Sequence, residues 1–185
     1  MINARIFVVA ASLALATPVL LLADQTDPRL EQLFSALQAA DDVTAGETVA
    51  SDIWAIWLEI EDPSAALLMR QGIFQIQTRR LERALSTFNQ LTAKYAEIAE
   101  GWNKRATVRY LLGDLDGSVG DIQRTLALEP RHFGALSGLG MIYLQQDDPQ
   151  GALAAFEQVL AVHPTLRGIE QRVRALEEQI DGRSL

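Results

Sequence analysis

The sequence predicts an all-α protein made of stacked helix–turn–helix units, and a recurring spacing of 34 residues is the observation that indicates it. Small residues recur at this spacing in two phases, and a bulky apolar residue recurs in a third. The positions are Gly72, Ala106 and Gly140, then Ala84, Ser118 and Ala152, then Phe88, Ile122 and Phe156. Pro130 and Pro164 are separated by the same distance. A unit of this length cannot bury its apolar face alone, so the units must stack into a curved array. Such a surface favours a binding module over an enzyme.

The unit at residues 133–166 shows how the two helices of a hairpin arise. The first helix is predicted from apolar or small residues at helical spacing, namely Leu136, Leu139, Gly140 and Tyr143. After a turn, Asp148 is placed to cap the second helix, and Pro149 takes its first position, where no backbone N–H is needed. The second helix carries Ala152, Phe156, Val159 and Leu160. We expect Gly140 and Ala152 to let the two helices approach closely.

Residues 65–166 resemble three tetratricopeptide repeats (TPR). The third repeat, 133–166, has Leu136 and Val159 where the family pattern has Trp and Ala, and matches it at Leu139, Gly140, Tyr143, Ala152, Phe156 and Pro164. The second, 99–132, has Arg105 and Arg109 where the family has Leu and Tyr, and matches it at Trp102, Ala106, Ser118, Ile122 and Pro130. The first, 65–98, has Ala96 in place of proline and keeps Gly72, Ala84 and Phe88. The resemblance implies a right-handed solenoid of antiparallel helix hairpins.

Both ends of the array are predicted to be closed by helices. Residues 29–64 fit one further period, with Ala50 and Trp54 at the small and bulky positions of its second helix. We expect a divergent hairpin there that caps the N-terminal end of the stack. Two unrelated helices packed on the array are the alternative. Residues 167–185 are expected to form one amphipathic helix and a tail, which cap the C-terminal end with a charged outer face.

Residues 1–23 have the pattern of a secretory signal peptide. Arg5 is the only charge before Asp24, and the apolar core ends at the small residue Ala23. Residues 24–28 then form a short tether. An uncleaved anchor is the alternative, since the apolar run approaches the roughly 20 residues of a membrane-spanning helix. We therefore expect a periplasmic protein or, in the alternative, one anchored in the inner membrane and facing the periplasm.

Composition argues against several classes of function. The chain has 24 Asp and Glu against 16 Lys and Arg, a net charge of −8, which disfavours binding to nucleic acid or to anionic lipid. It has no cysteine and therefore no disulfide framework. The two histidines, His132 and His163, are expected to face solvent in the turns between repeats, without converging metal ligands. We expect no metal, no small-molecule cofactor and no enzymatic activity.

The concave groove is the predicted binding site. In TPR proteins the first helix of each hairpin lines this groove, so the resemblance implies which positions line it here. They are Met69, Ile73 and Ile76 in the first repeat, Asn103, Thr107 and Tyr110 in the second, and Ser137, Met141 and Gln145 in the third. This lining is mildly apolar and nearly uncharged, which suits an extended peptide or a partner's helix. The clamp by which some chaperone-binding TPR domains hold a terminal carboxylate is absent, because Asn103 and Lys104 are adjacent instead of four positions apart.

The function predicted from the sequence is a non-catalytic TPR adaptor of the bacterial envelope that binds a protein or peptide. The alternative is a structural scaffold that self-associates through its ends or through Trp54 and Trp57, which lie three positions apart and form a possible interface. The runs at 100–106 and 126–136 also resemble an uncharacterised group of small exported TPR proteins of alphaproteobacteria. That resemblance implies a periplasmic location and names no activity.

Overall fold

The computed structural model describes residues 24–183, and the segment 1–23 predicted to be a signal peptide lies outside the described residues. The regular structure in this range is helical, which confirms the all-α prediction. After a short 3-10 helix, η1 (Asp24–Thr26), the chain forms α1 (Arg29–Gln38), α2 (Val43–Trp57), α3 (Pro63–Gln77), α4 (Leu81–Lys94), α5 (Ala99–Leu112), α6 (Leu115–Leu128), α7 (Phe133–Gln145), α8 (Pro149–Val162) and α9 (Ile169–Arg183). None of the helices within residues 24–183 has the length and hydropathy needed to span a membrane.

Aspartates define where several helices begin. The carboxylates that accept backbone N–H groups at the starts of α2, α3, α6 and α8 belong to Asp42, Asp62, Asp114 and Asp148. Pro63 and Pro149 occupy the first turns of α3 and α8, where the helix has N–H groups without an internal acceptor. Gly113 caps the C-terminal end of α5, and its φ of 83° is a left-handed conformation that favours glycine. These local signals divide the chain into short hairpins.

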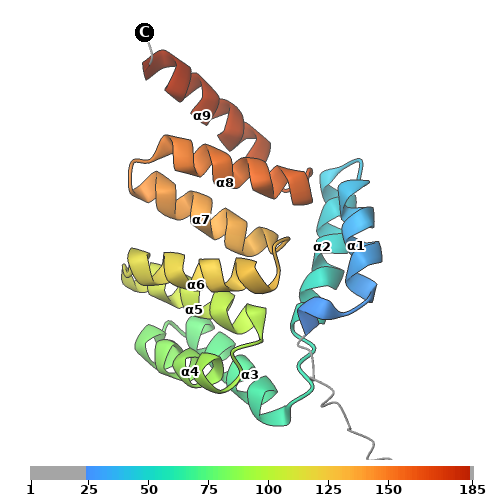
Figure 1. Ribbon diagram of the computed structural model, residues 1–185, viewed down its shortest axis with the longest axis vertical. Helices are drawn as coiled ribbons and strands as arrows, with labels where there is room; N and C mark the ends of the chain where they lie inside the picture. Colours follow the sequence, from blue (N-terminus) through green and yellow to red (C-terminus); the bar gives the residue numbers. More distant parts are fainter. Residues whose placement is uncertain (1–23, 184–185) are drawn as a thin grey trace, which may run out of the picture.

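Three hairpins form the stack. They pair α3 with α4, α5 with α6, and α7 with α8, and successive hairpins meet where α4 contacts α5 and α6 contacts α7 (Figure 1). At the C-terminal end, α9 packs on α8 through Ile169, Val173 and Leu176, which are buried. Its opposite face is exposed and carries Glu170, Arg172, Arg174, Glu177 and Glu178. The stack is therefore closed at this end by a charged surface.

Paired small and bulky residues hold each hairpin together. A Cβ atom added to Gly72 would lie 2.4 Å from the ring of Phe88, and one added to Gly140 would lie 2.5 Å from the ring of Phe156. Both phenylalanines are fully buried. In the middle hairpin Ala106 takes the place of the glycine, and a smaller partner, Ile122, takes the place of the phenylalanine. The 34-residue period thus reports a contact between the two helices of one unit.

The N-terminal hairpin lies alongside the stack, so the prediction that it caps the N-terminal end was wrong. Figure 1 shows α1 and α2 beside α5 to α8, and α1 contacts α8 directly. We call η1, α1 and α2 together the strap. The physical reason is that this hairpin buries its apolar face against α7 and not against α3. Phe34 and Trp57 share a buried cluster with Phe133, at the start of α7, and this cluster contains no residue of α3 or α4.

The strap contacts the two loops that join successive repeats and the loop that joins the third repeat to α9. At the first loop, the side-chain amide of Gln25 donates to the carbonyl oxygen of Glu97 over 2.7 Å. At the second loop, Trp57 stacks on His132, with ring centroids 4.1 Å apart. At the third loop, Gly46 of α2 faces Thr165, and a Cβ atom at Gly46 would lie 2.0 Å from its hydroxyl oxygen. The strap therefore links repeats that are not neighbours in the stack.

Candidate functional site

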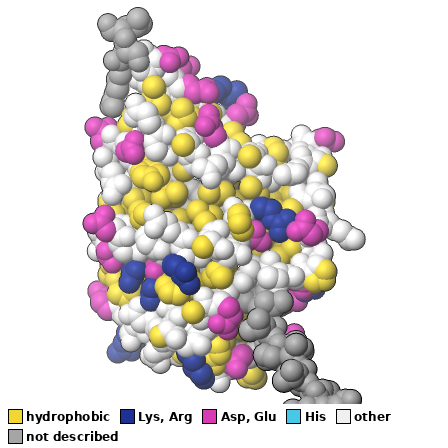
Figure 2. Space-filling view, viewed as in Figure 1, with side chains coloured by type: hydrophobic (Ala, Val, Ile, Leu, Met, Phe, Trp, Pro, Cys, Tyr) yellow, Lys and Arg dark blue, Asp and Glu magenta, His cyan; other side chains and the backbone are white. Residues whose placement is uncertain are grey.

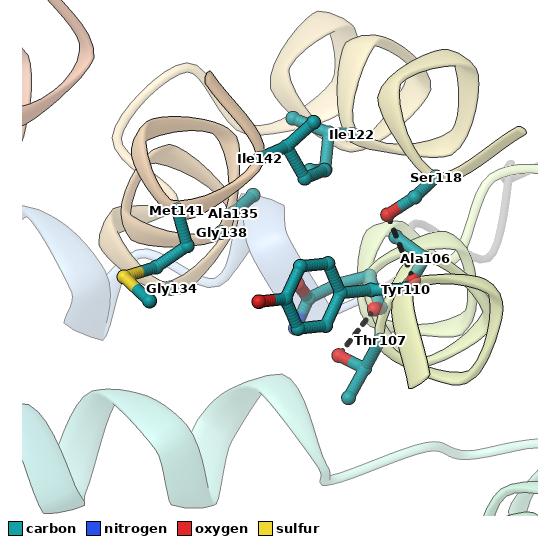
Figure 3. A pocket seen from close by; sticks show the side chains of 11 residues that line it. Ala106, Thr107, Tyr110, Ser118, Ile122, Gly134, Ala135, Gly138, Met141 and Ile142 are labelled. Carbon is teal, nitrogen blue, oxygen red and sulfur yellow. Dashed lines mark hydrogen bonds between the residues drawn. The ribbon is translucent and has the colours of Figure 1, made fainter. Parts of the chain in front are cut away.

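The groove contains an apolar cavity between the second and third repeats. Its volume is about 170 Å³, close to the roughly 150 Å³ of an engineered cavity that holds one benzene molecule. Its walls come from α5, α6 and α7 (Figure 3), and the lining residues are Asn103, Ala106, Thr107, Tyr110, Ser118, Ile122, Gly134, Ala135, Gly138, Met141 and Ile142. On the surface drawn in Figure 2, hydrophobic side chains gather in the middle of the face, with charged groups beside and below them.

Small residues create this cavity. Ile122 stands where the other two repeats have phenylalanine, so less side-chain volume fills the middle hairpin. On α7, Gly138 contributes no side chain, and a Cβ atom there would meet only Ile122, at an ordinary contact distance of 3.6 Å. Tyr110 projects from α5 toward α7, and Met141, which is 36% exposed, lies on the opposite wall (Figure 3). The cavity is thus open to one apolar group from outside the chain.

The structure brings four of the nine predicted groove residues to this cavity: Asn103, Thr107, Tyr110 and Met141. The other five do not line it. Met69 is buried in the core of the first repeat, Ile73 and Ile76 are half-buried on α3, and Ser137 and Gln145 lie on α7. The positions implied by the family resemblance therefore converge only where α5 faces α7.

Asn103 has a second role that the sequence did not reveal. Its side-chain amide donates to Glu100 over 2.8 Å, and both residues are buried. The Glu100 carboxylate also receives Lys104 Nζ at 2.7 Å and the imidazole Nε2 of His132 at 3.0 Å. A buried carboxylate is stable only when it is paired in this way. Asn103 is consequently both a wall of the cavity and a support for a buried charge.

The charge on Glu100 is maintained by its neighbours. Burial by itself raises the pKa of this carboxyl, but the positive charge of Lys104 and the hydrogen bond from His132 lower it more, so the pKa lies below its usual value. Lys104 also lies over the ring of Trp54, 5.0 Å from its centroid. The cluster therefore joins α5, the second inter-repeat loop and the strap beside the groove.

Both histidines are buried, which corrects the prediction that they face solvent. His132 caps α7, because its Nδ1 accepts the backbone N–H of Ala135 over 3.1 Å. That hydrogen bond leaves Nε2 as the protonated nitrogen that faces Glu100. Neither ring nitrogen of His163 has a hydrogen-bond partner among the described residues, and burial lowers its pKa. The histidines are buried because the strap covers the loops that carry them, and the sequence did not reveal where the strap lies.

Trp54 and Trp57 pack within the chain. Trp57 is 1% exposed, between His132, Phe133 and Phe34. Trp54 is half-buried and meets the ring of His132 edge-on. A Cβ atom on Gly134 would lie 2.7 Å from the Trp54 ring, so this glycine admits the indole. The possible interface predicted at these two residues is thus used for docking the strap, and Trp57 is not accessible to another molecule.

A buried ionic network explains where the second repeat departs from the family pattern. Arg105 forms two hydrogen bonds with the carboxylate of Asp121, of 2.8 and 2.7 Å, and Arg109 approaches the same carboxylate at 3.1 Å. Arg105 also lies over the ring of Trp102. The sequence signal was present, since two arginines four positions apart stand at positions that are apolar in the family. None of the three charged residues of this network lines the cavity.

Within residues 24–183 no group of three or more His, Asp or Glu side chains is arranged to hold a metal ion. Most titratable residues with buried side chains already have structural partners: those of the Glu100 and Asp121 clusters, Glu129 with Arg131, and Tyr95 with Asp62. His163 lies under the strap. The lining of the cavity supports contact with an apolar or amide-bearing group.

Stacked helix hairpins with a constant period and an open apolar groove define the class of helical-repeat solenoids. A family model for the tetratricopeptide repeat matches residues 103–166. A TPR repeat-containing protein of Rhizobium etli is 34% identical over 154 residues, which cover 83% of this chain and 76% of the relative. The chain therefore belongs to the TPR family, and the resemblance inferred from the sequence is confirmed.

Solved structures share the fold. The first TPR of Spaghetti (RPAP3), bound to an HSP90 peptide, matches with a TM-score of 0.62 at 16% identity, covering 66% of this chain and 97% of that one. MamA matches with a TM-score of 0.61 at 16% identity, covering 83% and 82% of the two chains. A TPR protein from Parabacteroides merdae has a TM-score of 0.58 at 21% identity, covering 83% of this chain and 59% of that one. At these identities the likeness is one of fold.

Proposed function

We propose that this TPR protein is a non-catalytic adaptor that binds an extended peptide or a helix of a partner protein in its groove. The observation that carries the proposal is the cavity between α5 and α7, with a volume of about 170 Å³ and an apolar lining. It is large enough for one aromatic or branched aliphatic side chain, by comparison with cavities that hold benzene. A pocket that buries one such anchor is the usual energetic centre of a protein interface.

The neighbouring polar groups suit an uncharged segment around the anchor. Thr107 and Gln145 are exposed, and the Tyr110 side chain is half-buried at the cavity. The solved TPR structure of Spaghetti (RPAP3) holds an acidic peptide, SRMEEVD. Here the lysine near the groove, Lys104, is already paired with Glu100. We infer that this groove selects an apolar anchor with uncharged neighbours in preference to an acidic terminus.

We propose further that the adaptor works in the bacterial envelope, as the apolar segment 1–23 and its boundary at Asp24 suggest. Intact mass of the protein extracted from the periplasm tests this. A mass that begins near Asp24 supports export and cleavage. A full-length chain found only in the membrane fraction would instead support the anchored alternative.

Peptide selection with a matched pair of variants tests the groove. A library of displayed peptides is selected on the immobilised protein, and we expect enrichment of peptides with one large apolar residue between uncharged residues. Gly138→Leu places a side chain into the cavity and should abolish this enrichment. Gly120→Leu on α6 is the control, because a Cβ atom there meets nothing within 4 Å.

Both variants are checked for folding by circular dichroism before selection. Equal enrichment on the Gly138→Leu and Gly120→Leu proteins would show that the cavity is not the binding site. Selection of peptides with acidic C-termini would contradict the proposed preference, even if the groove binds them.

A further inference from the structure

The outer side of α3 is a contact face between repeats that lacks its neighbour. The third and tenth residues of each repeat normally face the preceding repeat. In the second repeat they are Gly101 and Val108, and a Cβ atom on Gly101 would lie 3.1 Å from Leu91 of α4. Val108 is fully buried in the core of the first hairpin. In the third repeat they are Ala135 and Ile142, both buried against the second hairpin.

In the first repeat the same two positions are Leu67 and Phe74. Their exposed fractions are 57% and 55%, compared with 0% for Val108 and 1% for Ile142. The hairpin that the sequence places before α3 has become the strap, so among residues 24–183 no helix covers this face (Figure 1). Large apolar side chains at a repeat contact position that remain exposed mark an interaction surface.

The charges that flank α3 indicate what this surface binds. Glu61 precedes the helix, and Arg79 and Arg80 follow it; all three side chains are exposed. Within residues 24–183 none of the three forms an ion pair. A helix with an acidic start and a basic end is complementary to a second copy of itself that runs in the opposite direction. Opposite charges placed across such a contact favour one orientation and register.

The other end of the stack argues against a head-to-tail arrangement. That arrangement would place the apolar face of α3 against the outer face of α9, which carries Glu170, Arg172, Arg174, Glu177 and Glu178. Glu170 and Arg174 pair with each other, but burying Arg172, Glu177 and Glu178 against Leu67 and Phe74 would carry a large desolvation cost. A closed two-fold pair uses the same face from both copies and avoids this cost.

We propose that two copies of this chain pair through α3 about a two-fold axis, with the two helices antiparallel. An axis that passes between Arg70 and Gln71 places Leu67 of one copy opposite Phe74 of the other. Glu61 and Arg80 flank the two ends of α3, so the antiparallel arrangement brings Glu61 of one copy to the same end of the contact as Arg80 of the other. The groove between α5 and α7 stays outside this contact, so the inference is independent of the proposed peptide binding.

The absence of cysteine from the chain allows a direct test of the register. Gln71→Cys introduces one exposed thiol beside the proposed axis, where the two copies meet. We expect this variant to form a disulfide-linked dimer under mild oxidation. Gln123→Cys on the exposed surface of α6 is the matched control and should remain a monomer on a denaturing gel at the same concentration.

Sedimentation equilibrium of the full chain then measures the affinity. We expect a concentration-dependent dimer, and Phe74→Glu should raise the dissociation constant by at least about tenfold. Glu61→Arg and Arg80→Glu should each weaken the dimer, whereas the double variant should recover most of the loss, because the exchanged charges again face each other. Circular dichroism confirms that each variant retains the fold.

Several results would overturn the proposal. A wild-type chain that stays monomeric at all concentrations would show that the α3 face serves a different protein. A dimer that Phe74→Glu does not weaken would place the contact elsewhere. Failure of the double charge variant to recover binding, or equal disulfide formation by the Gln71→Cys and Gln123→Cys proteins, would exclude the antiparallel register.

Discussion

Trp57 lies parallel to His132, with ring centroids 4.1 Å apart and ring planes 8° apart. This stack joins the strap to the second inter-repeat loop, and it lies beside the hydrogen bond between His132 and Glu100. In most solenoids each repeat is stabilised only by its neighbours, so stability is a sum of local terms. Here the strap connects the loops of all three repeats, which should make unfolding of the stack more cooperative.

Replacing Trp57 with Ala tests this role of the strap. We expect a loss of about 3–5 kcal/mol in the free energy of unfolding, as for other buried aromatic residues. Urea unfolding followed by circular dichroism should also become less cooperative. Trp57→Phe is the control: it keeps a ring on His132 and removes an indole N–H that has no partner among the described residues. A Trp57→Ala protein as stable as the wild type would mean that the strap does not stabilise the stack.

Two glycines on α7 should respond to alanine in opposite directions. At Gly138 the new Cβ atom would meet Ile122 at 3.6 Å, so we expect a gain of about 0.5–1 kcal/mol from helix propensity. At Gly140 it would lie 2.5 Å from the ring of Phe156, and we expect a loss of about 1–3 kcal/mol from overpacking. Thermal unfolding measures both. Changes of the same sign in the two variants would contradict the packing described for this hairpin.

The middle hairpin should accept the residue pair of its neighbours only as a pair. Ile122→Phe alone is expected to destabilise the protein by about 1–3 kcal/mol, because Ala106 occupies space that glycine leaves open in the other two hairpins. Adding Ala106→Gly should recover part of this loss, and double-mutant analysis of unfolding free energies measures the coupling. Strictly additive effects would show that these residues do not share one contact. The double variant should also narrow the cavity.

Stability should decrease as the pH falls below about 6.5, and His163 is the reason. Burial lowers its pKa from 6.5 in the folded state, so the unfolded chain binds a proton first. The contribution of neutral His163 to the free energy of unfolding is therefore fully present above the pKa of the unfolded chain. It is lost as the pH falls toward the lower pKa of the folded protein, by at most about 1.4 kcal/mol per pH unit for one proton. Glu47 of α2 is the charge that opposes this shift.

A His163→Phe variant removes this titration while it keeps a planar ring at the position. Urea unfolding at pH 7.5, 6.5 and 5.5 should show a smaller decrease in stability for the variant than for the wild type. Glu100 has a lowered pKa and affects stability only at lower pH, below its ordinary value of 4.5. The same decrease in both proteins over this range would assign the effect to other groups.

The helices and hairpins followed from local features of the sequence. Asp148 and Pro149 determine where α8 starts, and the phase of Gly140 and Phe156 determines how α7 packs on it. These contacts connect residues within one repeat, so a single repeating pattern records them. The family resemblance implied nine groove residues, and four of them line the cavity, because the first helices of successive repeats face the same side.

The placement of the strap and the exposure of the α3 face were decided only by the tertiary structure. Trp54 and Trp57 have the same sequence signal whether their hairpin stacks on α3 or docks along the inter-repeat loops. The choice depends on contacts across long sequence distances: Trp57 with His132, Gly46 with Thr165, and Gln25 with Glu97. The sequence by itself determined the repeat and its local packing. The apolar hairpin could be buried either on the outer face of α3 or along the inter-repeat loops, and no local pattern encodes this choice. Its position along the loops determines that both histidines are buried and that the α3 face stays exposed.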